Sequence, residues 1–329
     1  MKINPILSKE LKLNARTIKL PLVLMVYNLV LSCVSILSLS GIQRQYESGF
    51  TVEYGELIGI FQILGWIQCV LVCFMVPIFT ASSITGERER QTLDIMLSTS
   101  IRPFQIVSGK LMASMCTVCI LVISSIPILS TAFIFGGMDW EYMLYFLLLI
   151  IVIGIYAGSA GIFFSTLVKK TPVAIGLTFL FLIFVIVGTI FILPMIDHLW
   201  KAFFYDSVNN GYIGTPPDIR WGALGLLVNP MILFFDFMEK SSGGAGVSAL
   251  LPELFGVSVG GRIDAFAEQS WLAVSIIVQL CIAFSFLIIS SWILNPLRSG
   301  RRKKEKQNFK RKRRDTVKKG KIHRIEIDL

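Results

Sequence analysis

The residues of this chain that are able to do chemistry gather in one short charged segment. Residues 84–100 read ITGERERQTLDIMLSTS, and four charged side chains follow one another from Glu87 to Arg90. Only two histidines occur, His198 and His323. Zinc and triad sites commonly need histidine with further ligands or partners. We therefore expect no histidine-based metal site, no Ser-His-Asp triad and no catalytic residue.

Two short patterns in the chain resemble functional motifs but lack their context. Cys116 and Cys119 form a CxxC inside an apolar stretch without flanking charge, which favours buried cysteines that pack as small hydrophobes. The phosphate-binding pattern GxxxxGK[ST] is absent around Gly109 and Lys110, because Leu111 follows them and Phe104 stands in place of the first glycine. The chain is therefore expected to have no ATPase site of its own.

The chain is dominated by six long uncharged stretches that contain no histidine. Hydrophobic residues make up 54% of the sequence, and charged residues only 16%, against about 25% in globular domains. A helix of roughly 20 apolar residues crosses a bilayer. We predict an all-α polytopic membrane protein whose six-helix permease domain covers residues 20–297. The predicted spans are 20–43, 57–83, 111–136, 142–168, 171–196 and 271–294.

The spans contain no ionisable side chain, which limits how the chain obtains energy for transport. A proton- or sodium-coupled carrier usually needs carboxylates inside the membrane. The lysines and arginines also fix an orientation. With six spans, 26 of them fall on the side of both termini and five on the other, and without the C-terminal tail the split is still 11 to 5. Positive residues accumulate inside, so we expect both termini in the cytoplasm.

Both ends of the chain are basic and are expected to lie against anionic lipid. Residues 1–19 predict a cytoplasmic amphipathic helix with a stripe of basic side chains that we assign to the membrane surface, although the charge also serves to fix topology. The tail, residues 298–329, has 15 basic residues against four acidic ones, which favours anchoring at the membrane or to a partner over nucleic-acid binding. The basic stripe comprises Lys9, Lys12, Arg16 and Lys19.

Two non-spanning segments have recognisable patterns. Residues 84–100 predict a cytoplasmic helix with apolar side chains at Leu93, Met96 and Leu97, placed either in a groove of another protein or against the membrane. The outer loop 197–270 contains an uncharged run, 221–235, which is too short to span. It predicts a re-entrant or interfacial segment that breaks at Asn229-Pro230.

The segment 84–110 resembles the cytoplasmic segment after the second span of type-2 ABC transporter permeases. Those proteins show ERE-x-x-T-L-(D/E)-x-L-L-x-T-P and then Gly-Lys, and Ser100 departs from the final proline. The opening residues 4–11, NPILSKEL, are similar to the family's N-terminal helix. The matching positions are Glu87, Arg88, Glu89, Thr92, Leu93, Asp94, Leu97, Thr99, Gly109 and Lys110.

The resemblance implies an exporter in a prokaryotic cell (plasma) membrane. It implies two permease subunits, identical or related, and two separate ABC ATPase subunits that bind ATP and Mg, so that this chain binds no cofactor. Residues 84–100 would then be the coupling helix that docks on an ATPase. The residues assigned to ATPase coupling are Glu87, Arg88, Glu89, Arg90, Thr92, Leu93, Met96 and Leu97.

The translocation path and the substrate are less well marked. Five large polar or aromatic side chains inside the spans are candidates for lining a path, although polar residues also hydrogen-bond helices to one another. Peptides, toxic amphiphiles, lipids and glycolipids remain open as substrates. The alternative function is a non-transporting scaffold that recruits a cytoplasmic partner. The candidate path residues are Asn28, Gln62, Trp66, Gln68 and Gln279.

Overall fold

The computed structural model consists of helices. It describes residues 7–8, 10, 18–48, 54–97, 102–136, 140–209, 220–255 and 262–295, and no strand occurs among them. Among these residues six helices are long and apolar enough to cross a membrane, which confirms the all-α polytopic fold. They are α2 (Lys19–Glu47), α3 (Tyr54–Glu89), α5 (Pro103–Gly136), α6 (Trp140–Leu167), α7 (Thr171–Asn209) and α11 (Trp271–Leu294).

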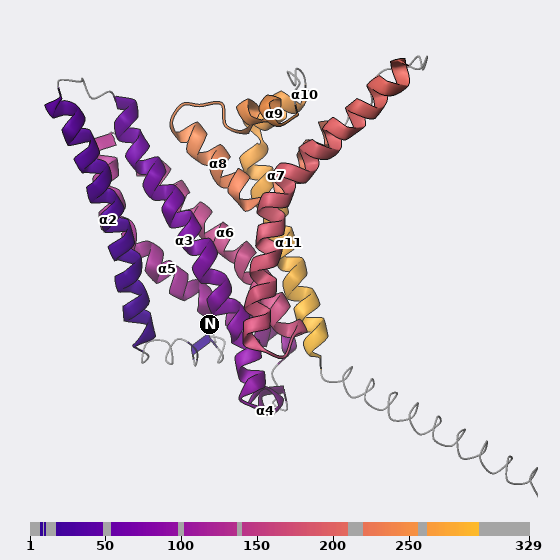
Figure 1. Ribbon diagram of the computed structural model, residues 1–329. Coiled ribbons are helices and arrows are strands. Elements are labelled where there is room, and N and C mark those ends of the chain that lie inside the picture. The colour runs from indigo at the N-terminus through magenta and orange to yellow at the C-terminus, as the bar shows by residue number, and fades with distance from the viewer. Residues whose placement is uncertain are drawn as a thin grey trace, which may run out of the picture.

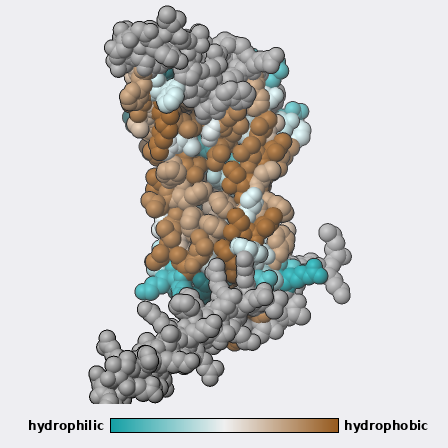
Figure 2. Space-filling model, turned by 90° about the vertical axis from the view of Figure 1, so that its right-hand side faces the viewer, coloured by the Kyte–Doolittle hydropathy of each residue, from teal (hydrophilic) through white to brown (hydrophobic). Residues whose placement is uncertain are grey.

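The six long helices run roughly along one direction and form a bundle (Figure 1). On the face seen in Figure 2, hydrophobic side chains cover the middle of the molecule and hydrophilic side chains gather across its lower end, where α4 (Leu93–Leu97) lies (Figures 1 and 2). Several helices outrun the uncharged stretches, since α3 continues to Glu89 and α5 already begins at Pro103. A helix satisfies its own backbone and need not stop where the apolar sequence stops.

Helix α6 is the most buried span, and its small residues allow α3 and α5 to approach closely. Gly154, Gly158 and Gly161 are all buried and face α3 and α5. A Cβ at Gly161 would overlap Thr80 Oγ1 and come within 3.2 Å of the backbone nitrogen of Ala81, whereas one at Gly154 would find its nearest neighbour 3.6 Å away. These three glycines therefore serve helix packing within one chain, the role that small residues commonly have in membrane helices.

We expect Gly161→Ala to destabilise the bundle and Gly154→Ala to leave it intact. The first adds a methyl group against the α3 backbone, and such overpacking costs about 1–3 kcal/mol. The second adds one where there is room, and alanine favours the helix. Thermal unfolding of the two purified variants in the same detergent checks this. Equal melting temperatures would show that α3 yields at Thr80 without cost.

Four short helices cover the bundle at the end opposite α4. They are η1 (Arg220–Val228), α8 (Pro230–Ser241), α9 (Val247–Phe255) and α10 (Arg262–Gln269) (Figure 1). The helical backbone is interrupted between η1 and α8 at Asn229, as the Asn229-Pro230 pair predicts. Asn229 caps α8, and its side chain accepts hydrogen bonds from Met231 N and Ile232 N. Asn229 also donates to Ile186 O and Thr189 Oγ1 of α7, so the break is fastened to a span.

Helices α2 and α7 are the least buried spans and lie at the periphery of the bundle. Helix α7 leaves the bundle in its outer part (Figure 1), and it contains Pro194, which removes one backbone donor and bends helices. Beyond Pro194, Asp197 and Lys201 form an ion pair, and Lys201 donates to Phe255 O of α9 at 2.8 Å. The outer part of α7 is therefore attached to the short helices through Lys201.

Candidate functional site at the α4 end

The charged segment forms a tight corner between α3 and α4. The corner is a Schellman turn, since Gln91 N donates to Arg88 O and Thr92 N donates to Glu87 O. Gln91 has a positive φ of 59°, a conformation that glycine usually supplies at this position. The helix predicted over 84–100 is thus two helices in the structure, because residues 84–89 continue the span α3. Arg90 is exposed at the corner.

Helix α4 has a buried and an exposed side. Leu93 is 5% exposed and belongs to the hydrophobic core, whereas Ile95 is 68% exposed. Met96 and Leu97 are half-buried. Leu93 therefore packs inward against the spans in this structure, and its assignment to ATPase coupling stays a prediction. Ile95 is the apolar side chain that α4 presents outward. A five-residue helix is too short for its sequence period to distinguish these sides.

Two residues of the charged run connect the end of α3 to the junction of α6 and α7. Arg88 donates to Val168 O at 2.6 Å and to Thr166 O at 3.2 Å, and both carbonyls lie at the C-terminal end of α6. Glu89 Oε1 accepts from Thr171 N at 2.7 Å, the first residue of α7. A cation at a helix C-terminus and an anion at an N-terminus both suit the helix dipole. Opposite charges therefore hold opposite helix ends.

Glu87, the first residue of the charged run, forms an ion pair with the buried Lys110. Lys110 of α5 is 2% exposed, and its Nζ lies 2.9 Å from Glu87 Oε1, 3.2 Å from Glu10 Oε1 and 2.8 Å from Ser83 O. Glu10 belongs to the N-terminal segment and Glu87 to the end of α3. One cation thus joins three parts of the chain that are far apart in sequence. We call Glu10, Glu87 and Lys110 the lysine node.

A hydroxyl network reinforces the same end of the bundle. Ser165 Oγ of α6 accepts from Ile84 N and Thr85 N of α3, at 3.1 and 3.0 Å. Thr171 Oγ1 donates to Thr85 Oγ1 at 3.1 Å. Within the described residues, the end of α3 that adjoins α4 therefore bonds to α5, α6 and α7. Lys110 also links it to Glu10 in the N-terminal segment.

Only some of the remaining residues assigned to this end lie within the described part of the chain. Thr92 lies in the corner, and its hydroxyl donates to Glu87 O at 3.2 Å. Of the basic stripe, Lys9, Lys12 and Arg16 lie outside the described residues, and Lys19 begins α2. The basic tail, 298–329, also lies outside them. Their assignment to the membrane surface stays a prediction.

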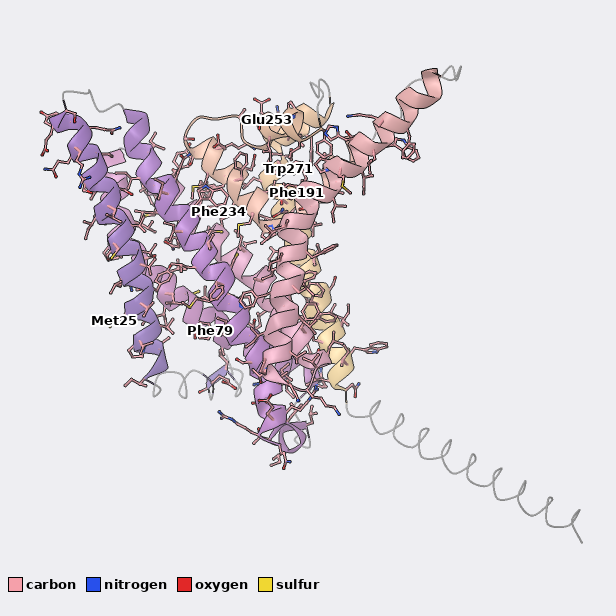
Figure 3. The ribbon with its side chains drawn as sticks, viewed as in Figure 1. Met25, Phe79, Phe191, Phe234, Glu253 and Trp271 are labelled. Carbon is pink, nitrogen blue, oxygen red and sulfur yellow. The ribbon has the colours of Figure 1, made fainter. Side chains whose placement is uncertain are left out.

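The five candidate path residues lie in three separate places. Gln62 of α3 donates to Ser242 Oγ at 3.1 Å, and Trp66 packs edge-on against Phe234 of α8, which lies inside the bundle (Figure 3). Gln279 of α11 is buried and donates to Leu227 O in η1. These three side chains hold the outer helices to the spans. They are interhelical contacts in this structure.

The other two path candidates meet α5 between spans. Asn28 of α2 donates to Ser124 Oγ at 3.0 Å, and Gln68 of α3 accepts from Ser125 Oγ at 3.2 Å. Gln68 is fully buried, and its Nε2 has no partner among the described atoms. The five residues therefore do not converge on one channel. Polar residues in spans commonly hydrogen-bond neighbouring helices, which fits what is observed here.

These features define a multi-pass membrane protein in which a short, partly exposed helix follows a span whose end is joined to several other spans by ion pairs and hydrogen bonds. Within the described residues no group of three or more histidine, cysteine or acidic side chains is placed to hold a metal ion.

The model of the ABC-2 family transporter proteins matches residues 6–210, more than half of the chain, and the chain belongs to this family. It is a permease subunit of an ABC transporter. No curated protein matches the sequence.

Proposed function

We propose that this chain is the translocating subunit of an ATP-driven exporter and that α4 is its coupling helix, the contact for a separate ABC ATPase. The observation that carries the proposal is the pair of properties found at α4. Ile95 is presented outward on a helix whose other side, Leu93, is packed into the core of the spans. An apolar side chain on a short helix suits docking into a groove of a partner.

The proposal places the α4 end in the cytoplasm of a prokaryotic cell membrane. The uneven distribution of lysine and arginine, 26 on the side of the termini and α4 against five on the other, supports this orientation. ATP and Mg would be bound by the partner ATPases, two in each complex. A second permease subunit, identical or related, would complete the path between the two bundles.

The contacts around α4 support a mechanism of force transfer. When ATP binding draws the ATPases together, α4 moves with the surface on which it is docked. Its corner is fastened through Glu87, Arg88 and Glu89 to α5, to the end of α6 and to the start of α7. Packed helices move as rigid bodies and do not deform continuously. The displacement of α4 therefore changes the packing of the spans against one another.

Purification of the tagged protein from its native membrane in a mild detergent tests the proposal. We expect an ATPase of separate sequence to co-purify and to hydrolyse ATP in the complex. The alternative is a scaffold that recruits a cytoplasmic protein without nucleotide turnover. A preparation that keeps other membrane complexes intact but yields no ATPase with this chain would favour the scaffold and contradict the exporter.

A further inference from the structure

A groove opens between α2 and α3 at the end of the bundle opposite α4. It has a volume of about 340 Å³, within the range of small-molecule sites. Ser38, Gly41 and Gln45 of α2 and Gly59, Ile60 and Ile63 of α3 line it. The geometry points to a binding site for one acyl chain of a phospholipid from the surrounding membrane.

Two glycines give the groove its width. A Cβ at either Gly41 or Gly59 would have nothing within 4 Å, so none of the described side chains fills the space beside them. Nearer the middle of the bundle the same two helices are closed against each other and against α5 by a cluster around Tyr27, Leu31 and Leu121. The groove is therefore a local opening at one end of a closed contact between helices.

The position of the groove argues for a lipid chain as the occupant. Its glycines lie within the uncharged stretches 20–43 and 57–86, and the charged residues Arg44 and Glu56 lie just beyond them. Apolar side chains line it, since Ile42, Ile60 and Ile63 are among its residues and Ile63 is 49% exposed. None of the described side chains that line it is charged. Among the described lining residues, the polar side chains are those of Ser38 and Gln45, and Ile42, Ile60 and Ile63 offer apolar contacts to an acyl chain.

The phospholipid head would lie where the groove meets water. Gln45 belongs to the last turn of α2, and the exposed Arg44 precedes it, so amide and cationic groups are at hand for a phosphate.

Photolabelling in nanodiscs tests this site. The probe is a phosphatidylglycerol with a diazirine in its acyl chain, added as a small fraction of the lipid, and the labelled peptides are quantified by mass spectrometry. Phe184 and Phe191 on the exposed face of α7, 65% and 68% exposed, report labelling by bulk lipid. We expect about fivefold more label on the groove residues, the ratio that corresponds to roughly 1 kcal/mol of preference.

Filling the groove should abolish the excess label. Gly41→Leu with Gly59→Leu places side chains in open space, so the bundle should fold and the label should fall to the level found on α7. Gly176→Leu is the matched control, because Gly176 of α7 also has nothing within 4 Å but lies away from the groove. It should leave the label unchanged. If the double variant does not purify, each single variant gives the same comparison.

Three results would overturn the assignment. Equal labelling of the groove and of α7 would mean that only bulk lipid touches these residues. Excess label that survives both leucines would mean that the probe reacts from another position. Disulfide-linked dimers formed through Gly41→Cys would mean that a second copy of the chain covers the groove.

Discussion

An Ile95→Asp variant is expected to enter the membrane as the unmodified protein does and to lose its partner ATPase. Ile95 is 68% exposed, so a carboxylate there remains in water and leaves the core of the bundle untouched. In a docked complex the same carboxylate would be buried in an apolar groove. Loss of a central contact residue commonly costs about 2 kcal/mol or more, which weakens binding roughly 30-fold. ATPase co-purification and ATP-driven transport should both fall accordingly.

Two further substitutions on α4 make the test specific. Leu93→Asp buries a charge at a site that is 5% exposed, so we expect it to damage the fold and to reduce the amount of protein in the membrane. Ile95→Ala keeps the surface apolar and should weaken the ATPase contact less than Ile95→Asp does. The measurements are membrane content, detergent stability and the ratio of ATPase to permease after purification. Undiminished co-purification with Ile95→Asp would remove α4 as the docking helix.

The spans could be predicted from sequence because the membrane imposes a one-dimensional rule. A helix in hydrocarbon must be apolar for about 20 residues, and this requirement is visible without any knowledge of tertiary contacts. The stretch 142–168 corresponds to α6 for this reason. The interruption at Asn229-Pro230 could also be predicted from neighbouring residues alone, because asparagine caps a helix and proline fits its first turn.

The contacts at the α4 end could not be predicted from one sequence. Lys110 meets Glu87, 23 positions earlier, and Glu10, 100 positions earlier, and no periodicity relates these residues. The corner at Gln91 also lacks its usual signal, because glutamine occupies the position where glycine is expected. The resemblance to ABC permeases placed Glu87 and Lys110 in one motif, but only the structure shows that they form an ion pair.

The inward and outward sides of polar or short elements were also beyond the sequence. Gln62 and Gln279 are polar residues in apolar helices, and the pattern alone fits a path lining and a helix-helix hydrogen bond equally well. The structure favours the second, because both side chains donate to the outer helical segments. In the same way, Leu93 and Ile95 are both apolar residues of one helical turn, and only tertiary packing distinguishes them.

Replacement of Lys110 by methionine is expected to have the largest effect on stability of any single change at the α4 end. Methionine fills a similar space but leaves Glu87 and Glu10, which are 14% and 23% exposed, facing each other without a cation. Removal of one partner from a buried ion pair typically costs 3–5 kcal/mol. Among the described atoms Glu87 Oε2 has no hydrogen-bond partner, and Glu87 Oε1 pairs with Lys110. We expect a sharply lower melting temperature and loss of ATP-driven transport.

Charge-neutral combinations separate a structural role of the lysine node from a role in coupling. In Lys110→Met with Glu87→Gln and Glu10→Gln no buried charge is left unpaired, and such replacements are often neutral for stability. If the node transmits the motion of α4 to α5 and the N-terminal segment, this triple variant should regain its melting temperature but not the transport driven by each ATP hydrolysed. Lys110→Arg keeps the cation and should retain part of both. Recovery of stability together with full coupling in the triple variant would show that the node only holds the fold, and force transfer would then have to run through Arg88 and Glu89 instead.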